Sequence, residues 1–324
     1  MKTQGLVLLT AMVSVTGVAP AQPYPQRPVR IIVNVSAGGG VDIVARIAGS
    51  HMSAVWGQTF VVDNRTGAGG AIGADIAAKA APDGHTLLVS SSTLITTAAM
   101  RGSGGAAGAL GYDPLRDLQA VSKLTANPYI ICVTPTLPVN SIKELIALAR
   151  SKSGGVSYGS SGNGAIIHMG AALLASMAGV TMVHVPYKGV VDVYPAVAAG
   201  QVDWGMGSPI SALPLIKAGR MKGIAVSSTR RARTLPDLPT VAESGLPGYE
   251  VTAWYGMFAP AKTPMVIVDR LQAEAKRALQ APEVVRRMDA EGTDIVASTP
   301  AQFGDEVKAE FEKWRAVVKK VGLQ

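Results

Sequence analysis

The sequence predicts an α/β protein in which two βα series form two lobes. Strand-like and helix-like segments alternate along most of the 324 residues, the pattern of mostly parallel sheets covered by helices. The pattern restarts around residues 121–135, and an apolar segment at 249–259 reads as a strand that crosses back. Hydrophobic residues make up 48% of the chain and charged residues 16%, a composition typical of globular rather than disordered proteins.

The first series begins with an apolar strand at residues 30–35. A helix is predicted at 41–55, because Val44, Ala48, Met52 and Val55 recur on one helical face. Residues 100–111 contain five glycines and no periodicity, so we predict a mobile loop there. The remaining elements of this series are strands at 59–62 and 86–89 and a helix at 71–80.

The second series begins with the apolar run at 129–133. Ser141 and Glu144 form a capping box that opens a helix to about residue 150. A second capping box, with proline at the first helical position, begins the last helix at Thr299. The other predicted strands are 156–158, 180–185, 202–206 and 223–227, and the other predicted helices are 166–177, 189–199, 264–279 and 282–291. Lobe 1 therefore takes residues 22–125 and 250–324, and lobe 2 takes residues 126–249.

The N-terminus has the pattern of a secretory signal peptide. Lys2 precedes an apolar stretch at residues 6–15, and Ala19-Pro20-Ala21 provides a cleavage site. The stretch is too short to remain as a membrane span. We therefore expect residues 1–21 to be a signal peptide that is cleaved after Ala21, and the mature protein to be periplasmic. No cysteine lies directly after the stretch, which argues against a lipid anchor. The single cysteine of the chain is Cys132, which is expected to fill the core.

The sequence carries no constellation that would support catalysis. It lacks a P-loop, a G-x-S-x-G nucleophile elbow and an S-x-x-K pair, and its four histidines have no metal-ligand spacing. The glycine-rich run at 67–73 lacks the dinucleotide spacing and is expected to allow close packing through small residues. The net charge of +8 is scattered and forms no basic and aromatic stripe. We predict no enzyme, no catalytic residue, no cofactor, no metal and no nucleic-acid partner.

A glycine turn at residues 36–42 is the first candidate ligand site. It joins a strand to a helix and contains Gly38, Gly39, Gly40 and Asp42. A turn that opens a helix presents unpaired N–H groups at the positive end of the helix dipole, which suits an anion. A tight turn without a ligand explains the same residues equally well.

Two further polar loops follow strands. Ser160, Ser161, Asn163 and Gly164 lie between a strand and a helix, where hydroxyls, an amide and N–H groups suit a carboxylate. The alternative is an Asn-Gly turn whose serine only caps the helix. The third cluster, residues 90–93, includes Ser91 and Ser92 at the end of a strand. Because ligands of such sheets lie beyond the strand ends, three polar loops there indicate a ligand cleft.

Other residues are open to two interpretations. His168, on the first turn after the second loop, is either a ligand contact or a packed or capping histidine. Asp203 either accepts a hydrogen bond from a ligand or ends a strand and caps a turn. Lys188 either closes the cleft or is a solvated loop charge. Trp254 and Tyr255 are expected to pack beneath the crossover strands.

The chain resembles the Bug family of periplasmic solute-binding receptors, which are associated with tripartite tricarboxylate transporters. The resemblance extends over nearly the whole mature chain. The matching stretches, in order, are RPVRIIV (27–33), VDNRTGAGG (62–70), APDG (81–84), YDP (112–114), YGSSGNG (158–164), HVPYKG (184–189), LPTVAE (238–243) and GLPGYE (245–250).

This resemblance implies a two-lobed periplasmic-binding-protein (Venus flytrap) fold whose two βα domains are joined by crossover strands. It implies capture of a small carboxylate through the glycine turn and the loop at 160–164, with Asp203 near the variable end of the ligand. The implied partners are membrane transporter subunits, or a signalling receptor if the protein is a sensor that does not transport. We expect a monomer.

Three departures from the family pattern concern the ligand. Val35 replaces an aromatic residue and Val41 a threonine, which makes the glycine-turn wall more apolar. Residues 204–208 and 97–110 also differ from the usual pattern. A dicarboxylate, an amino acid and an aromatic acid all remain open as ligands.

Overall fold

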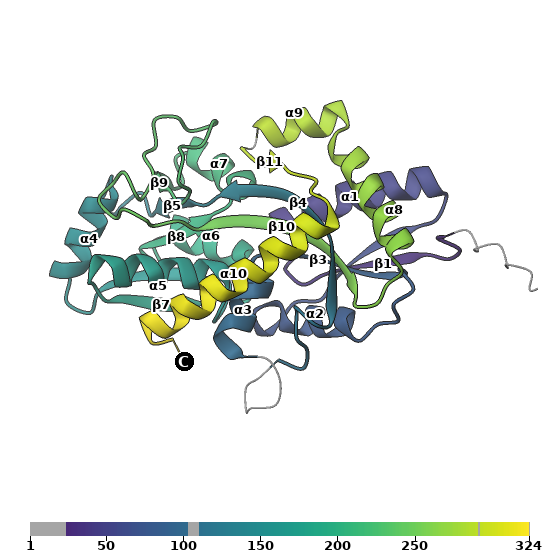
Figure 1. Ribbon diagram of the computed structural model, residues 1–324. Coiled ribbons are helices and arrows are strands. Elements are labelled where there is room, and N and C mark those ends of the chain that lie inside the picture. Colours follow the sequence, from purple (N-terminus) through teal and green to yellow (C-terminus); the bar gives the residue numbers. More distant parts are fainter. Residues whose placement is uncertain (1–23, 103–109, 291, 324) are drawn as a thin grey trace, which may run out of the picture.

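The computed structural model (Figure 1) describes residues 24–102, 110–290 and 292–323. It contains two sheets with helices interleaved around them, one sheet in each lobe of an elongated molecule. The predicted two-lobed α/β fold is thereby confirmed. The predicted signal peptide and its cleavage site lie outside the described residues, as does most of the predicted loop at 100–111. Among the described helices, none combines the length and the apolar character that crossing a membrane requires.

The first lobe is built on a six-stranded sheet. Three neighbouring strands run parallel in the order β2-β1-β3, and β10, β4 and β11 extend the sheet with antiparallel pairings. Its strands are β1 (Val29–Val33), β2 (Phe60–Asn64), β3 (Thr86–Ser91), β4 (Leu118–Pro128), β10 (Thr252–Pro260) and β11 (Asp294–Ile295). Its helices are α1 (Gly40–Trp56), η1 (Ala68–Gly70), α2 (Ala71–Ala78), α3 (Thr93–Arg101), α8 (Met265–Leu279), α9 (Pro282–Ala290) and α10 (Pro300–Val321).

The second lobe is built on a five-stranded sheet in the order β7-β6-β8-β5-β9. The pairings of β6 with β7 and β8 are parallel, whereas β5 pairs antiparallel with β8 and β9. The strands are β5 (Ile130–Val133), β6 (Val156–Ser160), β7 (Met182–Pro186), β8 (Trp204–Gly207) and β9 (Lys222–Val226). The helices are α4 (Ile142–Ser151), α5 (Ile166–Ala178), α6 (Val190–Ala198) and α7 (Pro209–Lys217).

The expectation of mostly parallel sheets is wrong. Five of the nine described strand pairings are antiparallel. The reason is the connectivity, because β4, β5 and β10 pass between the lobes without the helical crossover that a parallel pairing needs.

Most predicted elements agree with the structure, and α3 is the informative exception. The predicted helices at 41–55, 71–80, 141–150, 166–177 and 264–279 are confirmed to within two residues at each end. Helix α3 begins in the hydroxyl cluster that we read as a strand end, and it continues through Thr96 and Thr97. Threonine favours helices weakly, but residues 93–99 are all buried, so tertiary packing overrides the local preference.

The two lobes are joined where two chain segments cross between the sheets, and Ser227 ties these segments together. The chain leaves the first sheet at Pro128 and enters the second at Ile130, and it returns between Val251 and Thr252. Ser227, which is fully buried, exchanges backbone hydrogen bonds with Tyr129 and Val251 (Ser227 N to Tyr129 O 2.8 Å, Val251 N to Ser227 O 2.9 Å). Its Oγ also accepts from Tyr129 N–H (2.8 Å) and donates to Val251 O.

Helix α10 spans both lobes. It starts at the capping box that the sequence predicts, with Thr299 accepting from Gln302 N–H. From there the yellow helix in Figure 1 crosses the molecule and packs on β4 and α3 of the first lobe and on α5 of the second. Phe303 and Trp314 are buried on its inner face, so the C-terminal helix adds an apolar tie beside the crossover.

We predict that Ser227→Ala destabilises the fold. The substitution leaves the Tyr129 N–H and one lone pair of the Val251 carbonyl without their buried partner, which costs roughly 1–3 kcal/mol of unfolding free energy. Chemical denaturation followed by circular dichroism measures the change.

Ser228→Ala is the matched control, because the Ser228 hydroxyl only donates to the Arg230 carbonyl at the surface. Equal stabilities of the two variants would contradict the role given to Ser227.

Candidate functional site

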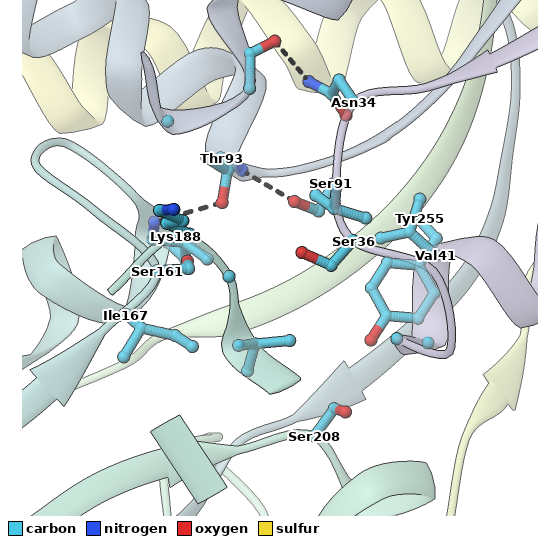
Figure 2. A pocket seen from close by; sticks show the side chains of 18 of the residues that line it. Asn34, Ser36, Val41, Ser91, Thr93, Ser161, Ile167, Lys188, Ser208 and Tyr255 are labelled. Atoms are coloured by element: carbon cyan, nitrogen blue, oxygen red, sulfur yellow. Dashed lines mark hydrogen bonds between the residues drawn. The ribbon is translucent and has the colours of Figure 1, made fainter. Parts of the chain in front are cut away.

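A cavity lies between the two lobes and takes its lining from both of them and from the crossover strands (Figure 2). It holds about 640 Å³ of space free of protein atoms, part of which is open to solvent. The lining residues come from the loops at the strand ends and the helix starts that follow them: 34–36, 39–41, 67, 69, 70, 91, 93, 129, 161, 166, 167, 188–190, 194, 208 and 255.

Six helices begin at this cavity: α1, α2, α3, α5, α6 and α7 each place an N-cap or first-turn residue in its lining. In none of these six does the N-cap side chain accept a hydrogen bond from a backbone N–H of its helix, and three of the N-caps are glycine. By contrast, α4 and α10, whose first residues do not line the cavity, are capped by Ser141 and Thr299. Helix α8, which also begins away from the cavity, has no side-chain cap at Pro264. At the cavity, neighbouring side chains bind the first N–H groups of α3 and α5, since Ser91 Oγ accepts from Thr93 N–H and Thr93 Oγ1 accepts from Ile166 N–H, but no N-cap side chain caps its own helix there.

The helix starts leave backbone N–H groups free to bind a ligand. The N–H groups of Gly40, Val41 and Asp42 in α1, and of Val190 and Val191 in α6, make no hydrogen bond to any described residue. Each helix also places the positive end of its dipole at the cavity, so the positive potentials of several helices add there. This arrangement suits an anion.

The charges around the cavity also favour an anionic ligand. Among the described lining residues, Lys188 is the one with a charged side chain, and no acidic side chain is present. Lys188 is exposed, and no hydrogen bond or ion pair to its side chain is found within the described residues. A cavity with positive potential and no acidic group raises the local concentration of anions.

Asp42 shapes the glycine turn and does not line the cavity. Its buried carboxylate accepts from Gly38 N–H (3.0 Å), Arg46 Nε (2.9 Å) and Asn64 Nδ2 (3.0 Å). Burial alone would raise the pKa of the Asp42 carboxyl, but the hydrogen bonds from Arg46, Gly38 and Asn64 hold it below its usual value. Asp42 thereby fixes Gly38 in its left-handed conformation (φ 81°), which aims the start of α1 at the cavity.

Two stacked histidines form hydrogen bonds with the loop at residues 160–164. The rings of His168 and His184 lie 4.1 Å apart between centroids. His168 Nδ1 accepts from Gly164 N–H (3.1 Å), and His184 Nε2 is 2.6 Å from Ser160 Oγ, which accepts from Gly162 N–H. These bonds hold the loop that places Ser161 in the cavity lining.

Burial favours the neutral form of both histidines. It lowers the pKa of His168, and burial together with the repulsion that a protonated His168 would exert lowers the pKa of His184 to about 4. In the neutral form His168 Nδ1 can accept a hydrogen bond, which the protonated ring cannot do.

The two lobes contact each other beside the cavity, through one hydrogen bond and through closely packed glycines. Thr93 Oγ1 of the first lobe accepts from Ile166 N–H of the second (3.3 Å). A Cβ at Gly69 would come within 3.2 Å of the Asn163 carbonyl, and a Cβ at Gly189 would overlap Ser36 Oγ. The glycine-rich run at 67–73 therefore packs closely, as predicted, and also allows contact between the lobes. The two lobes are therefore in direct contact at these loops.

The predicted site residues fall into three groups. Gly39, Gly40, Ser91 and Ser161 line the cavity. Five others support the two loops: Gly38, Asp42, Ser160, Gly164 and His168. The remaining three lie apart from the lining: Ser92 is buried with its Oγ unpartnered, Asn163 is exposed, and Asp203 binds Lys152 Nζ (2.8 Å) and Ser157 N–H (2.7 Å).

The sequence analysis missed the hydroxyl groups that come from the crossover and from the second lobe. Tyr255 was expected to pack beneath the crossover strands with Trp254, but it lines the cavity while Trp254 packs against Phe303. Successive residues of a strand face opposite sides, and this alternation is the signal that separates the two. Other lining residues that the sequence analysis did not identify are Asn34, Tyr129, Tyr194 and Ser208, whereas Thr93 belongs to the predicted cluster at 90–93.

Comparisons with known proteins agree on one family. Residues 44–323 match the family described as "Tripartite tricarboxylate transporter family receptor". A protein encoded in the tcbD-tcbE intergenic region of Pseudomonas sp. strain P51 is 37% identical over 96% of this chain and 91% of its own length.

Three solved structures are similar over nearly their whole length. Rpa4515 of R. palustris, described with adipate, is 32% identical with a TM-score of 0.85 and covers 93% of this chain and 99% of its own. MatC of Rhodopseudomonas palustris, with bound malate, is 31% identical with a TM-score of 0.85 (91% and 100% covered). The periplasmic binding protein BugD is 33% identical with a TM-score of 0.84 (93% and 99%). The resemblance to Bug proteins that the sequence motifs indicate is confirmed.

We predict that the histidine pair makes stability depend on pH. The unfolded chain takes up protons near the ordinary histidine pKa of 6.5, whereas folded His184 takes up its proton near 4. Between these values the unfolded state binds more protons, so the free energy of unfolding falls as the pH falls from about 6.5 to about 4. Urea unfolding at a series of pH values measures this dependence.

The control is His184→Gln, whose amide nitrogen can take the place of Nε2 beside Ser160 without titrating. This variant should lose part of the decline between these pH values. An identical pH profile in the variant and the wild-type protein would contradict the account.

Proposed function

Because the chain belongs to the tripartite tricarboxylate transporter receptor family, we propose that it captures a small carboxylate in the cavity between its lobes. The family membership makes it a solute-binding receptor, and the adipate and malate named with two relatives support a carboxylate as its solute. The observation that carries the proposal is the convergence of six helix starts, none capped by its own N-cap side chain, on a cavity whose described lining contains no acidic side chain.

Binding uses groups from both lobes. The free N–H groups of α1 belong to the first lobe and those of α6 to the second. The two helix starts are neighbours, since a Cβ at Gly39 would lie 3.7 Å from Val190 Cγ1, and the proposed carboxylate accepts from both. A ligand that contacts both lobes favours the closed arrangement over an open one by the free energy of those contacts. The crossover at Tyr129 and Val251 is the place where the hinge motion occurs, and the closed form is what a membrane partner recognises.

We assign site roles from the placement of the residues. Gly39, Gly40, Ser91 and Ser161 contact the ligand, whereas Asp42 and His168 position the two loops. Among the residues expected to bind the ligand, Asp203 is best explained as a structural group, since Lys152 and Ser157 occupy its carboxylate.

The remaining sequence predictions form part of the same proposal. The protein is exported through residues 1–21 and works in the periplasm as a monomer, without catalytic activity. It delivers its ligand to the membrane subunits of a tripartite transporter. The lobes divide at residues 125/126 and 249/250, close to the observed crossover of the strands.

We predict that Gly39→Asp lowers the affinity for the ligand without lowering the stability of the fold. Gly39 is the N-cap of α1 with an extended conformation (φ −77°, ψ 164°) that aspartate adopts readily at this position. A Cβ there would meet its nearest neighbour at 3.4 Å. The new carboxylate caps α1 and occupies the N–H groups meant for the ligand, so stability stays equal or rises while affinity falls about a hundredfold or more.

Isothermal calorimetry against a panel of carboxylates measures the affinity, and mass spectrometry of the molecule released from the purified protein guides the choice of panel. Gly39→Asn is the matched control, since it has the same shape without the charge and should lose less affinity. A carboxylate that binds Gly39→Asp as tightly as the wild-type protein would rule out this site.

A further inference from the structure

A groove on the surface of the first lobe lies between α1 on one side and the end of α8 and α9 on the other, and we call it the α1–α9 groove. It holds about 930 Å³ of space free of protein atoms, part of which is open to solvent. Helix α1 packs against α8, and α9 follows α8 in the upper part of Figure 1. Ala278, Ala281 and Val284 form the wall opposite α1. No lining residue of this groove also lines the cavity between the lobes.

Helix α1 carries two apolar faces. Its inner face, which includes Val44 and Met52, is buried. A second stripe of Ile43, Ile47 and Ala54 recurs at helical spacing and lines the groove. The stripe extends about 16 Å along the axis, the length of about three helical turns. Because a surface helix normally turns polar side chains away from the core, a second apolar stripe beside a groove indicates a contact surface.

The charged side chains of the groove are mainly basic. Among its described lining residues two are arginines, Arg46 and Arg287, and one is acidic, Glu283. The Arg46 side chain is 53% exposed. Apolar walls that carry basic groups are complementary to an amphipathic helix with acidic side chains.

Arg46 connects the groove to the glycine turn of the cavity. Its Nε donates to the Asp42 carboxylate (2.9 Å) and its Nη2 to Asn64 Oδ1 (3.2 Å). The same carboxylate accepts from Gly38 N–H. A guanidinium has five N–H donors, so Arg46 has donors left for a carboxylate that approaches from the groove. An occupant of the groove therefore contacts a residue that holds the glycine turn in place.

We propose that the α1–α9 groove docks an amphipathic helix of the membrane partner, with the apolar face of that helix on α1 and a carboxylate side chain on Arg46. The inference rests on the proposed function, which supplies a membrane partner. The docking surface lies wholly on the first lobe, and the link from Arg46 through Asp42 to Gly38 lets the docked partner respond to the state of the ligand loop.

The test measures how tightly the protein, loaded with its co-purified ligand, binds the membrane subunits of tripartite transporters encoded in the same genome and held in lipid nanodiscs. Ser50→Glu places a carboxylate four residues after Arg46 on the groove side of α1, where it pairs with Arg46 and repels an acidic helix. This variant should weaken docking about tenfold or more. Ser50→Gln is the matched control, because it has the same shape without the charge and should dock as the wild-type protein does.

A second variant tests the apolar stripe. Ala54 is exposed and lines the groove, so Ala54→Trp fills the groove without disturbing the core and should also weaken docking about tenfold or more. Ala147→Trp, at an exposed position of α4 on the second lobe, is its control. Calorimetry with the carboxylate that binds best and thermal unfolding should give wild-type values for all four variants, which separates a loss of docking from misfolding.

Docking of Ser50→Glu or Ala54→Trp at the wild-type affinity would overturn the inference, as would an equal loss of docking in Ser50→Gln. Wild-type protein that binds empty nanodiscs as well as loaded ones would reveal a lipid surface instead. A dimer in sedimentation that both groove variants abolish would reveal a second copy of the chain. These results, like a wild-type protein that binds a carboxylate but none of the subunits, overturn the docking site and leave carboxylate capture intact. If the wild-type protein binds no carboxylate, the proposed function itself fails.

Discussion

The unpaired N–H groups at the start of each helix are the constraint on which this structure depends. A helix start must be satisfied by a side chain, by water or by a ligand. Two helices that begin elsewhere, α4 and α10, use side-chain caps, and the six that begin at the cavity do not. Because glycine, alanine or a serine whose hydroxyl does not cap the helix stands at those N-caps, the positive potential of the helix starts is not neutralised by a cap. Under the proposed function, the protein recognises an anion mainly with its backbone, with Lys188 as the charged side chain of the described lining.

The remaining architecture serves to bring these helix starts together. Glycines at the lobe contacts, Gly69 and Gly189 among them, let the loops approach closely enough to enclose the cavity. Asp42 and the pair of His168 and His184 hold the two ligand loops from behind. Ser227 joins both crossing segments, so the proposed hinge is a defined hydrogen-bonded unit rather than a loose linker. The same crossover supplies Tyr129 and Tyr255 to the cavity, which places ligand recognition next to the hinge.

Local sequence signals predicted the parts of this site that depend on local structure. Strand, glycine turn and helix follow one another at residues 30–55, and the capping boxes at Ser141 and Thr299 mark helix starts correctly. Features set by distant contacts were not predictable in this way. Helix α3 forms from threonine-rich sequence because it is buried, and Tyr129, Tyr194 and Ser208 meet only after β5 pairs with β8. The role of Ser227 likewise requires two segments that are far apart in the chain.

A crystal structure of the protein with its co-purifying ligand tests the central claim most directly. The account predicts a carboxylate whose oxygens accept hydrogen bonds from the N–H groups of residues 40–42 in α1 and 190–191 in α6, directly or through one water. A ligand whose carboxylate is instead neutralised by an arginine or lysine away from these helix starts, with the N–H groups facing only solvent, would contradict it.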